Sequence, residues 1–259
     1  MMDPIMDLNL WITLCSVGFL AGLIDAIAGG GGMLTVPTLL TSGLPPHIAL
    51  GTNKLAATFG SLTASITFYK KKLFDPTFWR LSMLFTALGA IIGTLIVSSL
   101  SVSFLEKALP VLIIITAIYT LIAKNVVCNE EGLPDPTPTL KITQSIQGFV
   151  LGLYDGVAGP GTGAFWTASS SALYKINILL SCGLARSGNF VSNFCSLLTF
   201  IYLGSVNALL GISMGVFIMA GSWVGAHSAI KFGSRFIRPF FIIIVVIMSC
   251  NLAYQAWTQ

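Results

Sequence analysis

Two glycine-rich stretches lie 130 residues apart, and they are copies of each other. FLAGLIDAIAGGGG (19–32) aligns with FVLGLYDGVAGPGT (149–162), so that each copy has an aspartate four residues before a glycine. At an offset of 132 the match continues, since GAIIG (89–93) aligns with GSWVG (221–225). Self-similarity of this kind indicates that the chain is an internal duplication of one structural unit.

Apolar stretches recur through both copies and leave no room for a soluble domain. Of all residues 8% are charged and 55% hydrophobic, whereas a soluble domain carries about 25% charged residues. The chain is therefore predicted to be an all-α polytopic membrane protein, embedded in the lipid bilayer. The hydrophilic linker 126–141 separates a first transmembrane repeat, 1–125, from a second, 142–259. The first apolar segment follows two acids and no base, so it is not expected to be a removable signal peptide.

Each repeat is predicted to contain about five helical segments, with helices broken at the glycine-rich motifs. The segments are 8–28, 32–43, 46–69, 77–99 and 104–123 in the first repeat, and 142–158, 161–174, 177–203, 208–230 and 236–257 in the second. A helix needs about 20 residues to cross the hydrocarbon, so the shortest pieces beside the breaks fit a re-entrant or half-spanning role. The sequence leaves open whether these pieces cross fully or turn back.

The charges of equivalent loops indicate that the two repeats have opposite orientations. KKKLFDPTFWR (70–80) is basic, whereas its counterpart IYLGSVNAL (201–209) has no charge. The bias is reversed for SSLSVSFLEK (98–107), with one base and one acid, and KFGSRFIR (231–238), with three bases and no acid. Because cytoplasmic loops carry the excess of Lys and Arg, the repeats are predicted to be inverted. If each repeat crosses the membrane an odd number of times, both termini then lie outside and the linker lies in the cytoplasm.

Inverted repeats with broken helices are typical of secondary transporters, which bind their substrate near the midplane of the membrane. The free N–H groups at the start of a half-helix can hold an anion there. Close helix packing is the alternative use of the glycines, but a matched break in the second repeat favours a central site. The backbone groups assigned to this site belong to Gly30, Gly31, Gly32, Gly161 and Thr162.

Two cations occupy matched positions deep within the third segment of each repeat, Lys54 and Arg186. They are expected to hold the anion, Arg186 with a planar fork of donors and Lys54 as a point charge. For either cation taken alone, the alternative to anion binding is that its long side chain extends to the membrane interface. The neighbouring polar side chains expected to add neutral donors are Thr52, Asn53, Ser187 and Asn189.

Asp25 and Asp155 are the matched acids that precede the two breaks. An acid inside a membrane is costly, so it lines a pathway, relays protons or pairs with a base. Each carboxylate could instead accept hydrogen bonds from backbone N–H groups that the break leaves free. Proton coupling and capping of the break therefore both stay open for these residues.

Other functional classes find little support in the residue pattern. There is no nucleophile–base pair, and neither the cysteines nor the two histidines have a metal-ligand spacing, so no enzyme, cofactor or metal site is expected. The basic residues lie mainly at segment ends, so the net charge of +4 does not indicate a nucleic-acid partner.

Three motifs resemble the TauE/SafE family of membrane transporters, which includes sulfite exporters and organosulfonate permeases: GLIDAIAGGGGMLTVP, ALGTNKLAATFGS and YDGVAGPGTGAF. The resemblance covers nearly the whole chain. It implies a bacterial-type inner-membrane carrier for a sulfur-containing or related small anion, driven by an ion gradient in which H+ is a candidate. One departure is Leu184, where the family often has Thr, so one hydroxyl is missing from the expected cage.

The leading interpretation is a secondary transporter that moves sulfite or an organosulfonate by alternating access. A carrier of another small anion, such as a carboxylate, is the alternative within the same class. A membrane enzyme and a channel are the alternatives from other classes.

Overall fold

The computed structural model describes residues 8–122 and 132–232, and this part of the chain forms nine helices. Their bounds are α1 (Leu8–Ala28), α2 (Gly32–Thr41), α3 (Pro46–Lys70), α4 (Arg80–Ser99), α5 (Val102–Ile122), α6 (Pro138–Val157), α7 (Thr162–Tyr174), α8 (Ile178–Tyr202) and α9 (Ala208–Phe232). They follow the predicted segments closely, although α6 begins at Pro138 and not at 142. The predicted segment 236–257 lies outside the described residues.

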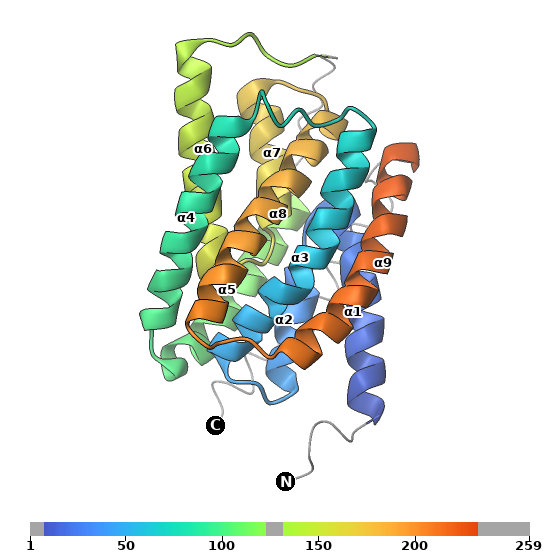
Figure 1. Ribbon diagram of the computed structural model, residues 1–259, viewed down its shortest axis with the longest axis vertical. Coiled ribbons are helices and arrows are strands. Elements are labelled where there is room, and N and C mark those ends of the chain that lie inside the picture. Colours follow the sequence, from blue (N-terminus) through green and yellow to red (C-terminus); the bar gives the residue numbers. More distant parts are fainter. Residues whose placement is uncertain (1–7, 123–131, 233–259) are drawn as a thin grey trace.

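Two pairs of helices turn back on themselves in the interior. Figure 1 shows the outer ends of α1 and α2 at the lower end of the molecule, and those of α6 and α7 at the upper end. α2 has 10 residues and α7 has 13, fewer than the about 20 that cross a bilayer. The turning points are the two glycine-rich breaks, which therefore meet from opposite ends inside the helical bundle.

α3 and α8 lie side by side at the centre, and a close helix pair flanks them on each side (Figure 1). α1 packs along α9 on one side, and α4 packs along α6 on the other. Among the described helices, α1, α4 and α9 are long and apolar enough to cross a membrane. α3 and α8 instead bury polar and charged side chains. The outer helices thus shield a polar centre.

Glycines allow the flanking helix pairs to approach backbone to backbone. A Cβ on Gly22 would lie 2.1 Å from the carbonyl oxygen of Ile218 on α9. On the other side, a Cβ on Gly152 would lie 2.3 Å from the carbonyl oxygen of Thr86 on α4. Small residues at such crossings are how membrane helices pack closely. We call these two contacts the glycine seams, α1–α9 and α4–α6.

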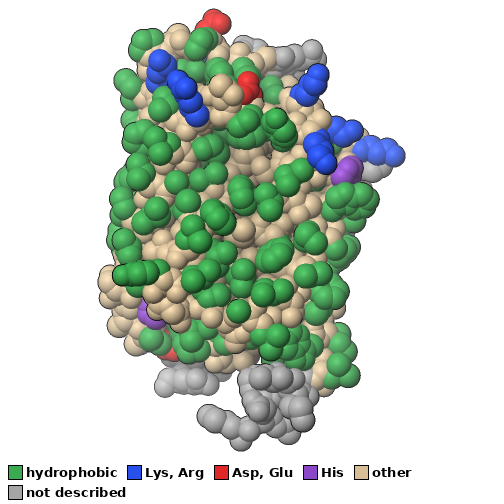
Figure 2. Space-filling view, in the orientation of Figure 1, with side chains coloured by type: hydrophobic (Ala, Val, Ile, Leu, Met, Phe, Trp, Pro, Cys, Tyr) green, Lys and Arg blue, Asp and Glu red, His purple; other side chains and the backbone are tan. Residues whose placement is uncertain are grey.

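The exterior is apolar around its middle. Figure 2 shows hydrophobic side chains spread over the centre of one face, whereas Lys and Arg gather at its upper end. Leu88, Ile146 and Val150 are among the exposed apolar residues of α4 and α6. An apolar surface of this extent is unfavourable in water and suits contact with lipid. The described residues thus form the all-helical fold with apolar membrane spans that the sequence predicts.

Candidate functional site

The two helix breaks are joined directly at the centre of the molecule. Gly29 and Gly159, which occupy matched positions, have left-handed φ angles of 77° and 88°. Glycine adopts this region at little cost, and here it ends α1 and α6. The backbone N–H of Ala164, at the start of α7, donates a hydrogen bond to the carbonyl oxygen of Gly29 over 3.0 Å. The backbone of each break thus becomes part of one shared site.

The carboxylate of Asp25 spans the first break. Its Oδ1 accepts a hydrogen bond from the backbone N–H of Gly31 over 3.0 Å. Its own carbonyl oxygen accepts a hydrogen bond from the N–H of Gly29 over 2.9 Å. The side chain is partly exposed to the pocket described below, and it has no ion-pair partner among the described residues. Asp25 therefore satisfies one of the donors that the break leaves free.

Asp155 makes more contacts at the second break. Its Oδ1 lies 3.0 Å from the Nζ of Lys54, and both side chains are buried. The Nζ of Lys54 also donates a hydrogen bond to the carbonyl oxygen of Asp155 over 2.6 Å. The hydroxyl of Thr162 lies 3.0 Å from Oδ1, and the hydroxyl of Ser192 donates to Oδ2. A buried ion pair of this kind is favourable only when its remaining polar atoms are satisfied, as they are here.

Arg186, the counterpart of Lys54, has no such partner. Its side chain is fully buried, yet none of its three guanidinium nitrogens has a hydrogen-bond partner among the described residues. Its end lies against Gly163, where an added Cβ would stand 2.6 Å from Nη1 and 2.8 Å from the Nδ2 of Asn189. Burial of a cation without a partner costs free energy, so a negative charge bound at this position would be stabilised.

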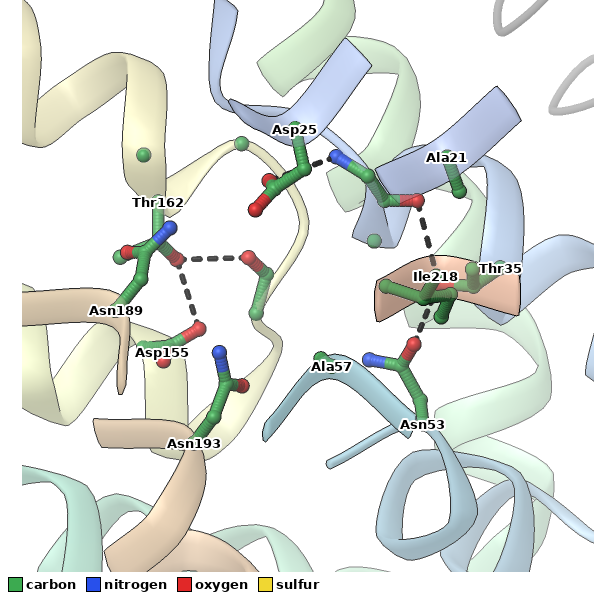
Figure 3. Close-up of a pocket in the computed structure, with 15 residues that line it drawn as sticks. Ala21, Asp25, Thr35, Asn53, Ala57, Asp155, Thr162, Asn189, Asn193 and Ile218 are labelled. Carbon is green, nitrogen blue, oxygen red and sulfur yellow. Dashed lines mark hydrogen bonds between the residues drawn. The ribbon is translucent and has the colours of Figure 1, made fainter. Parts of the chain in front are cut away.

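A pocket opens between the two breaks and the central helices (Figure 3). Two carboxylates, Asp25 and Asp155, line it together with the hydroxyls of Thr35 and Thr162. Three amide side chains complete its polar lining: Asn53 from α3, and Asn189 and Asn193 from α8. Amides offer both donors and acceptors, so the pocket can bind an oxygen-rich solute and also orient the carboxylates.

Many of the sequence-predicted site residues line this pocket. They are Asp25, Asp155, Gly31, Gly32, Asn53, Gly161, Thr162 and Asn189. The others lie outside its lining, namely Gly30, Thr52, Lys54, Arg186 and Ser187.

Two of the residues outside the lining are engaged elsewhere. The hydroxyl oxygen of Thr52 accepts a hydrogen bond from the backbone N–H of Asn207 over 2.9 Å. The hydroxyl of Ser187 pairs with that of Ser65 over 2.8 Å. The two cations lie behind residues that line the pocket. Lys54 is paired with Asp155, and Arg186 lies against Gly163.

Sequence reasoning missed two polar lining residues, Thr35 and Asn193. The hydroxyl of Thr35 donates to the Oδ1 of Asn53 and so fixes that amide. Asn193 lies one helical turn after Asn189, on the same face of α8, and this spacing is a signal that could have identified it. Thr35 has no equivalent signal, because its matched position in the second repeat is Phe165.

Comparisons with known proteins agree over nearly the whole chain. A family model described as "Sulfite exporter TauE/SafE" matches residues 14–252. A "Probable membrane transporter protein" of Haemophilus influenzae is 36% identical and covers 96% of this chain and 97% of its own. The "Probable membrane transporter protein YfcA" of Escherichia coli K12 is 35% identical over 94% of this chain and 89% of its own. No solved structure matches.

Proposed function

Because the chain belongs to the sulfite exporter TauE/SafE family of membrane transporters, we propose that it carries sulfite or an organosulfonate across the inner membrane. The family and these relatives are described as transporters and not as enzymes, in agreement with the sequence prediction. In this proposal the substrate binds in the pocket between the two helix breaks, and the two halves of the chain rearrange around it by alternating access.

The observation that carries the proposal is the unpartnered guanidinium of Arg186 beside Gly163 and Asn189. A guanidinium presents planar donors that match two oxygens of an oxyanion, and a neighbouring amide nitrogen adds a third. Gly163 both lines the pocket and touches Arg186, so only this glycine stands between the pocket and the guanidinium. Lys54 is the second cation of the proposed site, and in this conformation its charge is paired with Asp155.

We further propose that the two halves, 1–125 and 142–259, are inverted repeats joined by the linker 126–141. The support is reciprocal packing: the first helix of each half packs on the fourth helix of the other, as α1 does on α9 and α6 on α4. The helix pairs that turn back at the breaks, α1–α2 and α6–α7, also enter from opposite ends of the molecule (Figure 1). Because each half packs its first helix on the other half, the two halves can be related by inverted symmetry, as in transporters that work by alternating access.

The proposed orientation places the linker in the cytoplasm and both termini outside. Exposed bases lie in and beside the α3–α4 connection, at the start of α6 and at the end of α9, all at the upper end in Figure 1: Lys70, Lys71, Lys72, Arg80, Lys141 and Lys231. Because cytoplasmic ends carry the excess of Lys and Arg, this end is assigned to the cytoplasm. Arg235 and Arg238, the other bases of the stretch 231–238, lie outside the described residues.

The test is uptake into liposomes that contain the purified full-length protein. Labelled sulfite, methanesulfonate and acetate are compared for the unchanged protein, Arg186→Ala, Arg186→Lys and a control, Lys71→Ala, at an exposed position. Loss of a charge-assisted contact predicts that Arg186→Ala lowers uptake by about tenfold or more. Arg186→Lys is expected to retain part of the activity, and Lys71→Ala all of it.

Two outcomes would redirect the proposal. Undiminished uptake in Arg186→Ala would remove this residue from the anion site. Acetate uptake well above that of sulfite and methanesulfonate would favour a carboxylate carrier.

A further inference from the structure

We propose that Asp25 carries the coupling proton, and that one proton binds together with each singly charged anion. The proposal rests on the anion transport proposed above and names its driving ion. It starts from a difference between two acids that the duplication places in matched positions. Asp25 and Asp155 both line the pocket, but their partners are unlike.

Both carboxylate oxygens of Asp155 have partners, and one of these is a cation. Lys54 neutralises it over 3.0 Å, and the hydroxyls of Thr162 and Ser192 lie at its two oxygens. A proton on this carboxyl group would break the ion pair and leave the buried ammonium without a counterion, which is costly. Protonation of Asp155 would therefore break contacts that hold the second helix break together.

Asp25 has one hydrogen bond to its side chain, from the backbone N–H of Gly31 to Oδ1. Its Oδ2 accepts no hydrogen bond from the described residues, and the carboxyl group lines the pocket. A proton can therefore bind to and leave Oδ2 without breaking the contact that closes the helix break. This property separates Asp25 from Asp155.

The elements packed against α1 bring few other charges to Asp25. α2 has no titratable side chain, and α9 brings His227 and Lys231, both of which are exposed. The remaining titratable groups of α3 and α7 are Lys54, which is paired with Asp155, and His47, Tyr69, Lys70 and Tyr174 near the helix ends. The charge balance at the pocket is thus set by Asp25, Asp155, Lys54 and Arg186.

These four side chains sum to zero when both acids are ionised. A singly charged anion beside Arg186 makes the sum −1, and an uncompensated charge is unfavourable at membrane depth. A proton on Asp25 restores the sum to zero. The anion and the proton therefore bind together, are released together on the other side, and move no net charge across the membrane.

The test uses the full-length protein in liposomes, with labelled methanesulfonate as the probe, because a sulfonate keeps its charge of −1 across the neutral pH range. An imposed pH gradient is expected to drive accumulation of the label, with one proton entering per anion. An imposed membrane potential without a pH gradient is expected to drive none. Accumulation that follows the potential, or that ignores the pH gradient, overturns the proposal.

The variant Asp25→Asn removes the titratable group, while its amide oxygen can still accept the hydrogen bond from Gly31. We expect pH-driven accumulation to be lost, whereas exchange of internal unlabelled for external labelled methanesulfonate continues, because exchange needs no net proton transfer. The matched control is Asp75→Asn, an exposed acid in the α3–α4 connection, and it is expected to keep both activities. Asp25→Asn with undiminished pH-driven accumulation overturns the proposal.

Failure of this inference is distinguishable from failure of the proposed function. An unchanged protein that moves neither sulfite nor methanesulfonate overturns the proposed function and the proton assignment with it. Transport that is independent of pH overturns the proton assignment alone. If Asp25→Asn does not fold, the proton-to-anion ratio of the unchanged protein still decides, and Asp25→Glu is expected to retain the coupling.

Discussion

Gly29 lies so close to Gly163 that a Cβ on Gly29 would stand 2.4 Å from the backbone carbonyl carbon of Gly163. The hydrogen bond from the N–H of Ala164 to the carbonyl oxygen of Gly29 fastens the same contact. The two breaks are therefore attached by their backbones, and no side chain separates them. The guanidinium of Arg186 lies directly behind this contact, against Gly163.

Replacement of Gly29 by alanine is expected to destabilise the protein more than the same change at Gly43. Both glycines have left-handed φ angles, 77° and 85°, so both substitutions cost about 1–2 kcal/mol for the backbone conformation. Only at Gly29 does the new Cβ also meet backbone atoms, whereas nothing lies within 4 Å at Gly43. Thermal unfolding in detergent measures the difference, and equal losses at the two positions would contradict the contact.

Loss of Lys54 is expected to be costly, and a second substitution is expected to offset part of that cost. Lys54→Ala leaves the carboxylate of Asp155 buried without its cation, which lowers the free energy of unfolding by about 3–5 kcal/mol. Asp155→Asn in the same chain removes the unpaired charge, so the double variant is less destabilised than the sum of the single ones. A double-mutant cycle of unfolding measures this coupling.

The control for this cycle is Lys107→Ala, an exposed lysine on α5, combined with the same Asp155→Asn. These two changes should add without coupling. A coupling energy near zero for Lys54 and Asp155 would show that the ion pair does not stabilise the fold.

Both glycine seams are expected to be intolerant of larger residues. Gly22→Val and Gly152→Val place a side chain where a carbonyl oxygen of the neighbouring helix lies 2.1 Å and 2.3 Å from the Cβ position. Overpacking of this kind costs about 1–3 kcal/mol each, whereas Val150→Ala on the exposed face of α6 should cost far less. Unfolding temperatures in detergent test this, and tolerance of either valine would mean that the corresponding helices can separate.

The proposed orientation predicts which end of the molecule reacts with a membrane-impermeant thiol reagent. In a variant without its native cysteines, Lys71→Cys should be labelled from the cytoplasmic side, because it lies in the basic α3–α4 connection. Thr41→Cys, at the end of α2, should be labelled from the opposite side. Labelling in intact cells and in inverted vesicles checks both, and the reverse pattern would invert the topology.

Local signals were enough to predict the helices and the two breaks. An apolar run with a glycine at its end marks where α1 and α6 stop, and the end of α1 at Ala28 was predicted to the residue. The match between Asp25 and Asp155 likewise needed only the internal repeat. These features depend on residues that are near in sequence or related by the duplication.

Partners could not be predicted, because they depend on how the two halves pack. Lys54 contacts Asp155, which is 101 residues away in the sequence, and symmetry alone would have assigned Arg186 the equivalent partner, Asp25. The structure has the first ion pair and lacks the second among the described residues. A sequence repeat predicts which residues occupy equivalent positions. It does not predict that both equivalent contacts are present in one conformation.

The α1–α9 seam has a consequence for how the protein is made. α1 leaves the ribosome long before α9, the helix whose backbone it finally touches, has been synthesised. During that interval α1 must remain in the membrane without α9, and it is long and apolar enough to do so. α8 buries a charge and two amides, so it gains a favourable environment only when the outer helices surround it. The polar centre is therefore completed only after α9, the last of these outer helices, has been inserted.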